Sequence, residues 1–131
     1  MNRIQAKITH IQSVENLNIL TFESQNTKLT MMSLELSPML SVGSEVILTS
    51  KSTAIAIAKE PNTELSHANQ LKVQISSIEL GELLCSLELK FHSFVIESII
   101  TSEAAQRMQL QVGMDVIALI KANDLSLEKI I

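Results

Sequence analysis

Apolar and polar residues alternate along much of the chain with a period of two, which is typical of β-strands that have one buried face. In the second half, residues 70–80 and 83–101 follow this alternation. The residues predicted to share one face of the second stretch are Leu83, Cys85, Leu87 and Leu89.

The pattern changes after this stretch. Ser102–Leu110 contains helix-compatible residues, and either Thr101 or Ser102 can cap the first turn of a short helix. A strand-like apolar run follows at Val116–Ile120, directly before Lys121, and a last short strand is predicted over residues 125–130.

The two halves of the chain repeat each other. Residues 41–51 match residues 111–121 at an offset of 70, and residues 3–11 match residues 70–78 at an offset of 67. The first match keeps a glycine and a terminal lysine, Gly43 with Gly113 and Lys51 with Lys121. This indicates a duplication of about 65 residues. Each half reads as about five strands and one short helix. The chain is therefore predicted to be all-β, with one short helix per repeat, as two tandem OB-like five-stranded β-barrels.

The joint between the halves is polar and carries a proline. Pro61 and several polar turn formers occupy the stretch Lys59–Ser66, as is typical of a connection between domains. We expect the first repeat to span residues 1–60 and the second to span residues 65–131, with residues 61–64 as the linker.

Composition narrows the class of function. The formal net charge is −4, the only arginines are Arg3 and Arg107, and the chain has three Phe with no Trp or Tyr. Nucleic-acid binding needs a basic face, and single-strand binders also need stacking aromatic side chains, so nucleic acid is disfavoured as a ligand. The hydrophobic share of 46% in so short a chain indicates that some surface is buried between subunits.

The sequence predicts neither secretion nor membrane insertion. Residues 1–12 alternate instead of forming a continuous apolar region, and no apolar run approaches the ~20 residues that span a bilayer. The single cysteine, Cys85, excludes an intramolecular disulfide, and its place in an alternating strand favours a buried apolar role over a reactive thiol. We expect a soluble cytoplasmic protein.

The patterns that would indicate an enzyme do not occur. The histidines His10, His67 and His92 lack the spacing of metal ligands, and the three glycines are too far apart for a phosphate-binding loop. Carboxylates are scattered singly, so a paired acid and base has little support. We expect a protein that is not an enzyme and holds no metal cofactor.

Three groups of polar residues could instead bind an anion. Thr101 offers a hydroxyl ahead of a short helix, where the N–H groups of Ser102–Ala104 are expected to be free donors. Lys121 supplies charge at the end of a strand, and the turn Ser66–Asn69 offers further N–H groups and a hydroxyl. Together they could hold a tetrahedral dianion. The alternative, in which Thr101 is only a helix cap and Lys121 only a solvated lysine, stays open on these residues alone.

The second half resembles a Mop domain, the small OB-type module of molbindins, over residues 65–129. The resemblance rests on the motifs S-x-x-N-Q-L, I-I-T and A-L-I-K-A. Two such modules in one chain are similar to the di-Mop molbindins (tandem Mop/TOBE domains), which are cytoplasmic and bind molybdate or tungstate at interfaces between modules. The resemblance therefore implies binding and storage of that oxyanion in molybdenum homeostasis, by a homo-oligomer with a trimer of chains favoured.

The resemblance also implies which residues bind the oxyanion. In the second half these are Ser66, His67, Ala68, Thr101, Ser102, Lys121 and Ala122. Ala68 replaces the arginine of the family motif, which leaves Lys121 as the main charge. In the first half Lys51 and Ser52 remain, while Met31 stands at the threonine position on the 70-residue offset. The first half is expected to be mainly scaffold, or to lend Lys51 to a site completed by another module.

Two other functions are open. The replaced arginine and the incomplete first half favour a regulatory or interaction module that binds no ligand and associates with a molybdate ABC transporter. A pair of nucleic-acid-binding OB domains is the third possibility, against which the acidic charge and the missing aromatic side chains count.

Overall fold

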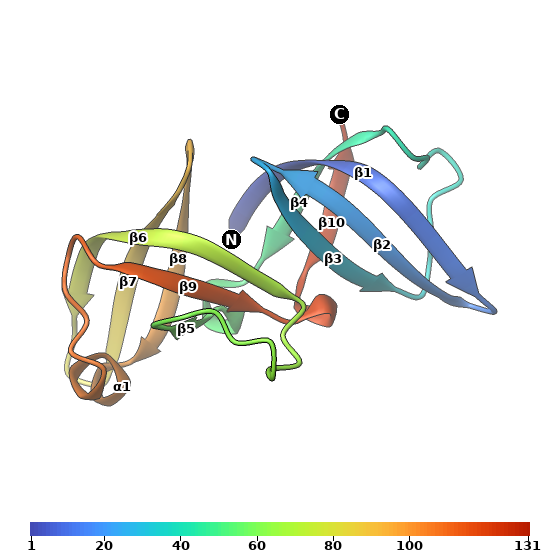
Figure 1. The fold of residues 1–131 in the computed structure, drawn as a ribbon. Coiled ribbons are helices and arrows are strands. Elements are labelled where there is room, and N and C mark those ends of the chain that lie inside the picture. The colour runs from blue at the N-terminus through green and yellow to red at the C-terminus, as the bar shows by residue number, and fades with distance from the viewer.

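The computed structural model describes residues 1–131 as ten β-strands, one α-helix and two 3₁₀ helices. The strands form two five-stranded antiparallel sheets, the two lobes of Figure 1. One sheet has the strand order β10-β4-β1-β2-β3, and the other has the order β5-β9-β6-β7-β8. The predicted all-β class with two five-stranded units is confirmed.

The elements of the first half are β1 (Asn2–Val14), β2 (Leu17–Ser24), β3 (Thr27–Ser33), β4 (Glu45–Ser50), the 3₁₀ helix η1 (Ser52–Ala54) and β5 (Ala56–Ala58). Those of the second half are β6 (Asn69–Leu80), β7 (Leu84–Phe91), β8 (Phe94–Thr101), α1 (Ser102–Arg107), β9 (Asp115–Ile120), the 3₁₀ helix η2 (Ala122–Asp124) and β10 (Ser126–Ile130).

The central strands β1 and β6 have the same pattern of burial, which explains why the alternation of the sequence folds into sheets with one apolar face. Each strand turns every second side chain into the core, namely Ile4, Ala6 and Ile8 in β1 and Leu71, Val73 and Ile75 in β6. These residues belong to one continuous apolar core that runs through both sheets.

A β-bulge interrupts each central strand after the third of these residues, Ile8 in β1 and Ile75 in β6. The Ile8 carbonyl accepts a hydrogen bond from the Gly43 N–H over 2.8 Å, and the Ile75 carbonyl accepts one from the Gly113 N–H over 2.8 Å. Both glycines have a φ of +96°, which residues with a Cβ rarely adopt. The repeated glycine is therefore a backbone requirement of the bulge.

The last strand of each repeat lies in the sheet of the other repeat. β5 pairs with β9, with Ile57 opposite Ala118, and β10 pairs with β4, with Leu127 opposite Leu48. We call β1–β4 with β10 the first module, and β6–β9 with α1 and β5 the second module. The boundaries 1–60 and 65–131 stay a prediction about the repeated sequence units, because in space the units exchange their fifth strands.

The helix predicted for each repeat forms only in the second module, so the prediction is wrong for the first. Residues 34–44 form turns without a helix. This segment is three residues shorter than its counterpart, since the offset between the repeats rises from 67 before it to 70 after it. Pro38 stands five residues before Gly43, at the place where the Met108 N–H donates to the Ala104 carbonyl in the second module. Proline has no N–H for that bond.

The strand register also corrects the assignment of Met31. The β2–β3 and β7–β8 pairings follow the offset of 67. On that offset Leu34 is the counterpart of Thr101, and Met31 is the counterpart of Ser98. Met31 is a buried core residue, so the residue that replaces the threonine in the first module is an exposed leucine, Leu34.

Two buried asparagines join the modules. Asn69 at the start of β6 accepts a hydrogen bond from the Thr30 N–H over 2.7 Å and donates to the Thr30 carbonyl over 2.9 Å. Asn69 Nδ2 also lies 3.1 Å from the Ile120 carbonyl oxygen. Asn2 at the start of β1 makes the same pair of bonds with the backbone of Glu97, over 2.7 and 2.8 Å. Each module therefore holds the third strand of the other through one amide side chain.

Replacing Asn69 by alanine is expected to lower the free energy of unfolding by about 3 kcal/mol, because three hydrogen bonds are lost, two to the part-buried backbone of Thr30 and one to the buried Ile120 carbonyl. Asn2→Ala removes fewer hydrogen bonds and should cost less. Chemical denaturation measures both losses against the exposed control Asn123→Ala. A loss for Asn69→Ala no larger than that of the control would contradict the bridging role.

Candidate functional site

The turn before β6 and the lysine after β9 meet where the modules join. Asn69 pairs with Ile120 in the β6–β9 ladder. Ser66–Ala68, just before β6, and Lys121, just after β9, therefore lie at the same end of these two strands. Lys121 is exposed and forms no salt bridge. Ala122 begins η2, which packs on β3 of the first module. We call Ser66–Ala68, Lys121 and Ala122 the Lys121 corner.

The first module has a matching corner. Asn2 pairs with Ser50 in the β1–β4 ladder, so Lys51 and Ser52 stand where Lys121 and Ala122 stand in the second module. Ser52 begins η1, which packs on β8. We call Lys51 and Ser52 the Lys51 corner. Both corners lie between the two lobes, near the centre of Figure 1.

Thr101 lies at the other end of the second module. It pairs with Leu84 at the start of β7, whose carbonyl accepts a hydrogen bond from Gly81 just after β6. The Lys121 corner adjoins the start of β6. The 12 residues of β6 correspond to roughly 35 Å along the strand, at about 3.3 Å per residue. Figure 1 accordingly shows α1 at the left of the molecule, away from the centre. One chain does not bring Thr101 and Lys121 together.

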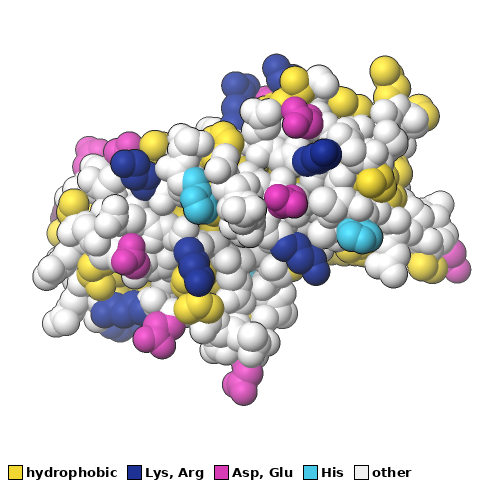
Figure 2. Space-filling model, turned by 45° about the horizontal axis from the view of Figure 1, so that its top comes forward, with side chains coloured by type: hydrophobic (Ala, Val, Ile, Leu, Met, Phe, Trp, Pro, Cys, Tyr) yellow, Lys and Arg dark blue, Asp and Glu magenta, His cyan; other side chains and the backbone are white.

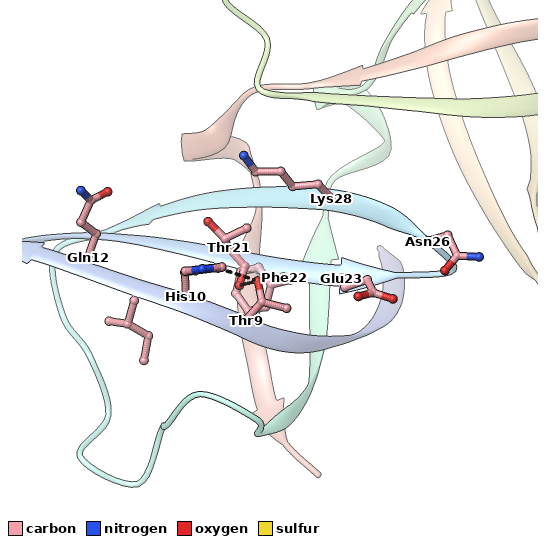
Figure 3. Close-up of a pocket in the computed structure, with 9 residues that line it drawn as sticks. Thr9, His10, Gln12, Thr21, Phe22, Glu23, Asn26 and Lys28 are labelled. Atoms are coloured by element: carbon pink, nitrogen blue, oxygen red, sulfur yellow. Dashed lines mark hydrogen bonds between the residues drawn. The ribbon is translucent and has the colours of Figure 1, made fainter.

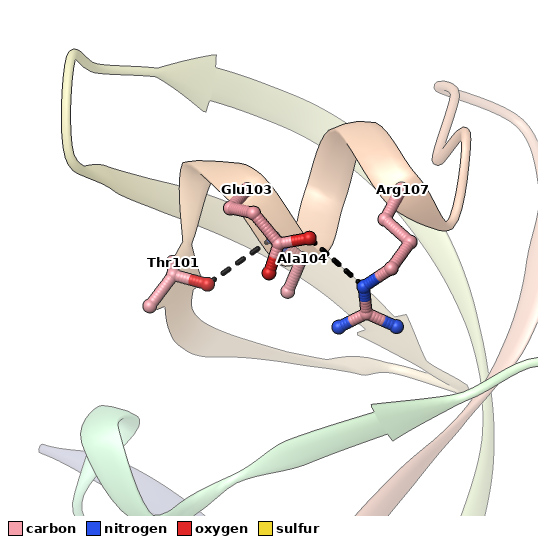
Figure 4. A network of polar contacts seen from close by, with 4 residues as sticks. All are labelled: Thr101, Glu103, Ala104 and Arg107. Carbon is pink, nitrogen blue, oxygen red and sulfur yellow. Dashed lines mark hydrogen bonds and ion pairs between the residues drawn. The ribbon is translucent and has the colours of Figure 1, made fainter.

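Local hydrogen bonds already use most of the donors at the start of α1. The Ala104 N–H donates to Thr101 Oγ1 over 3.1 Å (Figure 4), and the Ser102 N–H donates to the Leu83 carbonyl over 2.9 Å. The buried Ser102 hydroxyl donates to the Gly81 carbonyl over 2.8 Å. The expectation of free N–H groups over Ser102–Ala104 is therefore wrong for two of the three. The Thr101 hydroxyl accepts the capping bond and keeps its own proton for a second partner.

An ion pair lies on the exposed face of α1. Glu103 and Arg107 are joined by a contact of 2.9 Å between Oε2 and Nε, in the i,i+4 arrangement drawn in Figure 4. Such exposed pairs add little to stability, but here the two charges offset each other beside Thr101. The positive charge for an anion at Thr101 would therefore have to come from another part of the surface. The exposed lysines of the two corners carry a charge of that kind.

The Lys121 corner contains a buried nitrogen without a partner, His67 Nδ1. Gln70 ties the corner to the linker, because its side chain accepts from the Asn62 N–H over 3.0 Å and donates to the Asn62 carbonyl over 2.8 Å. Ala68 adds no side-chain donor where the Mop motif has arginine. Asn69 and Gln70 are structural residues that sequence reasoning missed, although the N-Q of the quoted motif was the signal for both.

A hollow of the surface lies away from all the predicted site residues. It has a volume of about 830 Å³ and opens over β1–β3, where Thr9, His10, Glu23 and Lys28 line it (Figure 3). His10 Nδ1 lies 3.2 Å from Thr9 Oγ1, whose hydroxyl donates to the Thr21 carbonyl over 3.2 Å. No group of three or more His, Cys, Asp or Glu side chains is placed to hold a metal ion.

Charges of both signs are interspersed on the face of the molecule in Figure 2. On that face lysines and arginines alternate with carboxylates and do not gather into a basic stripe of the kind that follows a nucleic-acid backbone. None of the helices is long and apolar enough to cross a membrane. Cys85 is fully buried, and burial raises the pKa of its thiol.

Comparison with known proteins finds a family match in the second half of the chain. Residues 65–127 match the family model of the TOBE domain. The whole chain shares its fold with a solved structure of the cytoplasmic molybdate-binding protein ModG with molybdate bound, with a TM-score of 0.89 and 23% identity over 96% of this chain and 94% of that chain. None of the curated proteins compared with the chain matches its sequence. The resemblance to tandem Mop/TOBE modules is thus confirmed at the level of the fold.

In the second module, Thr101→Ala is expected to lower the free energy of unfolding by about 1 kcal/mol, because α1 loses its N-cap. Thr101→Ser keeps the hydroxyl and should retain most of the stability. Chemical denaturation compares both variants with Thr63→Ala in the exposed linker. An alanine variant as stable as the wild type would show that the capping bond contributes nothing.

Proposed function

We propose that the protein binds molybdate or tungstate in the cytoplasm and stores it as the intact oxyanion, with no bond made or broken. The observation that carries the proposal is Lys121, an exposed cation without a carboxylate partner at a polar corner. The match to the TOBE domain supports it, and so does the fold shared with a protein described as molybdate-binding.

The separation of Thr101 from Lys121 favours sites between copies of the chain. Because the two residues lie at opposite ends of β6, they can contribute to one site only from different chains. Apolar side chains surround Thr101 and are left uncovered in the single chain: Leu80 is 51%, Leu83 79% and Leu84 58% exposed. An apolar surface of this kind favours contact with another copy. We infer a homo-oligomer, with a trimer implied by the Mop resemblance.

Each residue of the proposed site has a chemical role. Lys121 provides the positive charge, and the backbone of Ala122 and of Ser66–Ala68 provides N–H donors around it. The Thr101 hydroxyl of another copy donates the proton that its capping bond leaves free. His67 adds a hydrogen bond through its buried Nδ1, which has no partner within the chain. Charge-assisted bonds of this kind are the strong ones for a dianion. Ser102 serves indirectly, by fixing the start of α1.

Equilibrium dialysis against molybdate and tungstate, with metal analysis of the retained ligand, tests the role of Lys121. Lys121→Ala should weaken binding by about tenfold or more, because a hydrogen bond to a charged group is worth about 1.5–3 kcal/mol. Lys129→Ala on β10 removes the same charge outside the corner and should bind like the wild type. Retention of neither oxyanion by the wild type, or equal retention by Lys121→Ala, would refute the proposal.

A mixed oligomer tests whether two chains share each site. Thr101→Val and Lys121→Ala should each bind poorly alone, while an oligomer of the two variants made by co-expression should recover a fraction of the sites. Recovery is expected because some interfaces pair an intact Thr101 with an intact Lys121. Mixed oligomers that bind no better than either variant would argue against shared sites.

A second function has one specific observation in its favour. Ala68 stands at the arginine of the Mop motif, so the Lys121 corner has one charge fewer than the motif supplies. A ligand-free module that regulates a molybdate ABC transporter needs no such charge. On that alternative, the melting temperature of the protein is unchanged by molybdate and tungstate, and the protein co-purifies with the ATPase of the transporter.

A further inference from the structure

A hollow on the second module gathers three lysines, and we call it the Lys72 hollow. It has a volume of about 540 Å³ and lies over β6, β7 and β9, beside the linker. Its lining includes Lys59, Lys72, Lys90 and His92, with Asp115 as the only carboxylate. None of the three lysines forms a salt bridge. Positive charge therefore converges here without a partner inside the chain.

The strand register places the three lysines in a row. Lys90 on β7 lies opposite the residue two places after Lys72 on β6, so the Cα atoms of Lys72 and Lys90 are diagonal neighbours about 7–8 Å apart. Lys72 lies opposite Ile117 on β9, and Ile117 lies opposite the last residue of β5, just before Lys59. Lys59 is therefore two strands away from Lys72, or roughly 10 Å at about 4.8 Å per strand.

The first module has the equivalent hollow with a different charge. Gln5 and Glu23 line it at the positions that Lys72 and Lys90 occupy on the offset of 67. Its lining contains one lysine and two carboxylates, whereas the Lys72 hollow has three lysines and one carboxylate. The same scaffold therefore forms without the row of lysines, so the backbone does not require these charges.

The row of charges matches a linear anion. Lys72 and Lys90 are like charges on neighbouring strands and repel each other, and a bound anion would offset this repulsion. Lysine binds phosphate as a point charge, and a chain of phosphate groups can contact all three lysines without drawing them together. The lining contains no Phe, and the chain has no Trp or Tyr, so the hollow lacks the stacking platform that a base would use.

We propose that the Lys72 hollow binds a linear chain of phosphate groups, free or carried by an organic molecule. Lys72 contacts the middle of the chain, and Lys59 and Lys90 contact its two ends. His92 adds a ring nitrogen to the hollow, and its ring is held by an edge-on contact with Phe91 at 4.9 Å between centroids. The hollow shares no lining residue with the Lys121 corner, so this site is separate from that of the proposed function.

Isothermal titration calorimetry with tripolyphosphate at low ionic strength tests the site. Lys72→Gln combined with Lys90→Glu copies Gln5 and Glu23, which the same scaffold already tolerates, and should weaken binding by about tenfold or more. Lys7→Gln combined with Lys129→Glu changes the net charge by the same amount outside the hollow and should bind like the wild type. Gln5→Lys combined with Glu23→Lys builds the row in the first module and should raise the number of tripolyphosphates bound per chain.

The outcomes decide for or against a phosphate-chain site. A wild type that binds no tripolyphosphate overturns the proposal. Equal weakening by the Lys72/Lys90 pair and the Lys7/Lys129 pair also overturns it, because the attraction would then be to overall charge alone. ATP that binds comparably, and is lost in the same Lys72/Lys90 variant, supports recognition of the chain. ATP that binds about tenfold more tightly than tripolyphosphate overturns it, because the nucleoside would then be recognised.

The test is independent of the proposed function. The titrations contain neither molybdate nor tungstate, and Lys121 is unchanged in every variant. Failure of tripolyphosphate to bind leaves oxyanion storage at the Lys121 corner standing, and failure of oxyanion binding leaves the Lys72 hollow standing.

Discussion

Each sheet is completed by a strand from the other half of the chain, and the rest of the structure depends on this exchange. Without β10, strand β4 would be an open edge of the first sheet, and without β5 the same would be true of β9. The exchange brings the start of each central strand against the third strand of the other module. Asn2 and Asn69 can bridge the modules only because of that placement, and both corners lie beside these bridges.

The duplication kept the scaffold and let the chemistry of the two halves diverge. The bulges, the glycines at φ +96° and the asparagine bridges are the same in both modules. The side chains around the corners and at the module ends are not. Leu34 replaces Thr101, and Glu97 faces the position that Thr30 faces in the other module. Residues required by the backbone are thus repeated, and of the side chains that would meet a ligand only the lysine, Lys51 and Lys121, is repeated.

Much of the fold was predictable because it depends on local periodicity. The alternation around Leu71 and Leu87 and the repeated Gly43 and Gly113 were enough to predict two five-stranded units. The strand exchange was not predictable, because the short β5 shows the same apolar pattern whichever sheet it joins. The missing first helix could have been noticed from Pro38, but only once the strand register had placed the shorter segment there.

The candidate site was predictable as a set of residue types but not as an arrangement. The repeat drew attention to Lys51 and Lys121, and the capping pattern identified Thr101. That Thr101 and Lys121 lie at opposite ends of one strand depends on register, which periodicity alone does not determine.

The strand exchange also affects the order in which the molecule can assemble. The salt bridge between Arg3 and Glu128 joins residues 125 positions apart, so the first sheet closes only after β10 has been synthesised. Contacts between such distant residues form slowly. Until β10 is in place, β4 is an unpaired edge of the kind that can pair with a strand of another chain. The strand exchange therefore makes protection of the first sheet depend on the last strand of the second repeat.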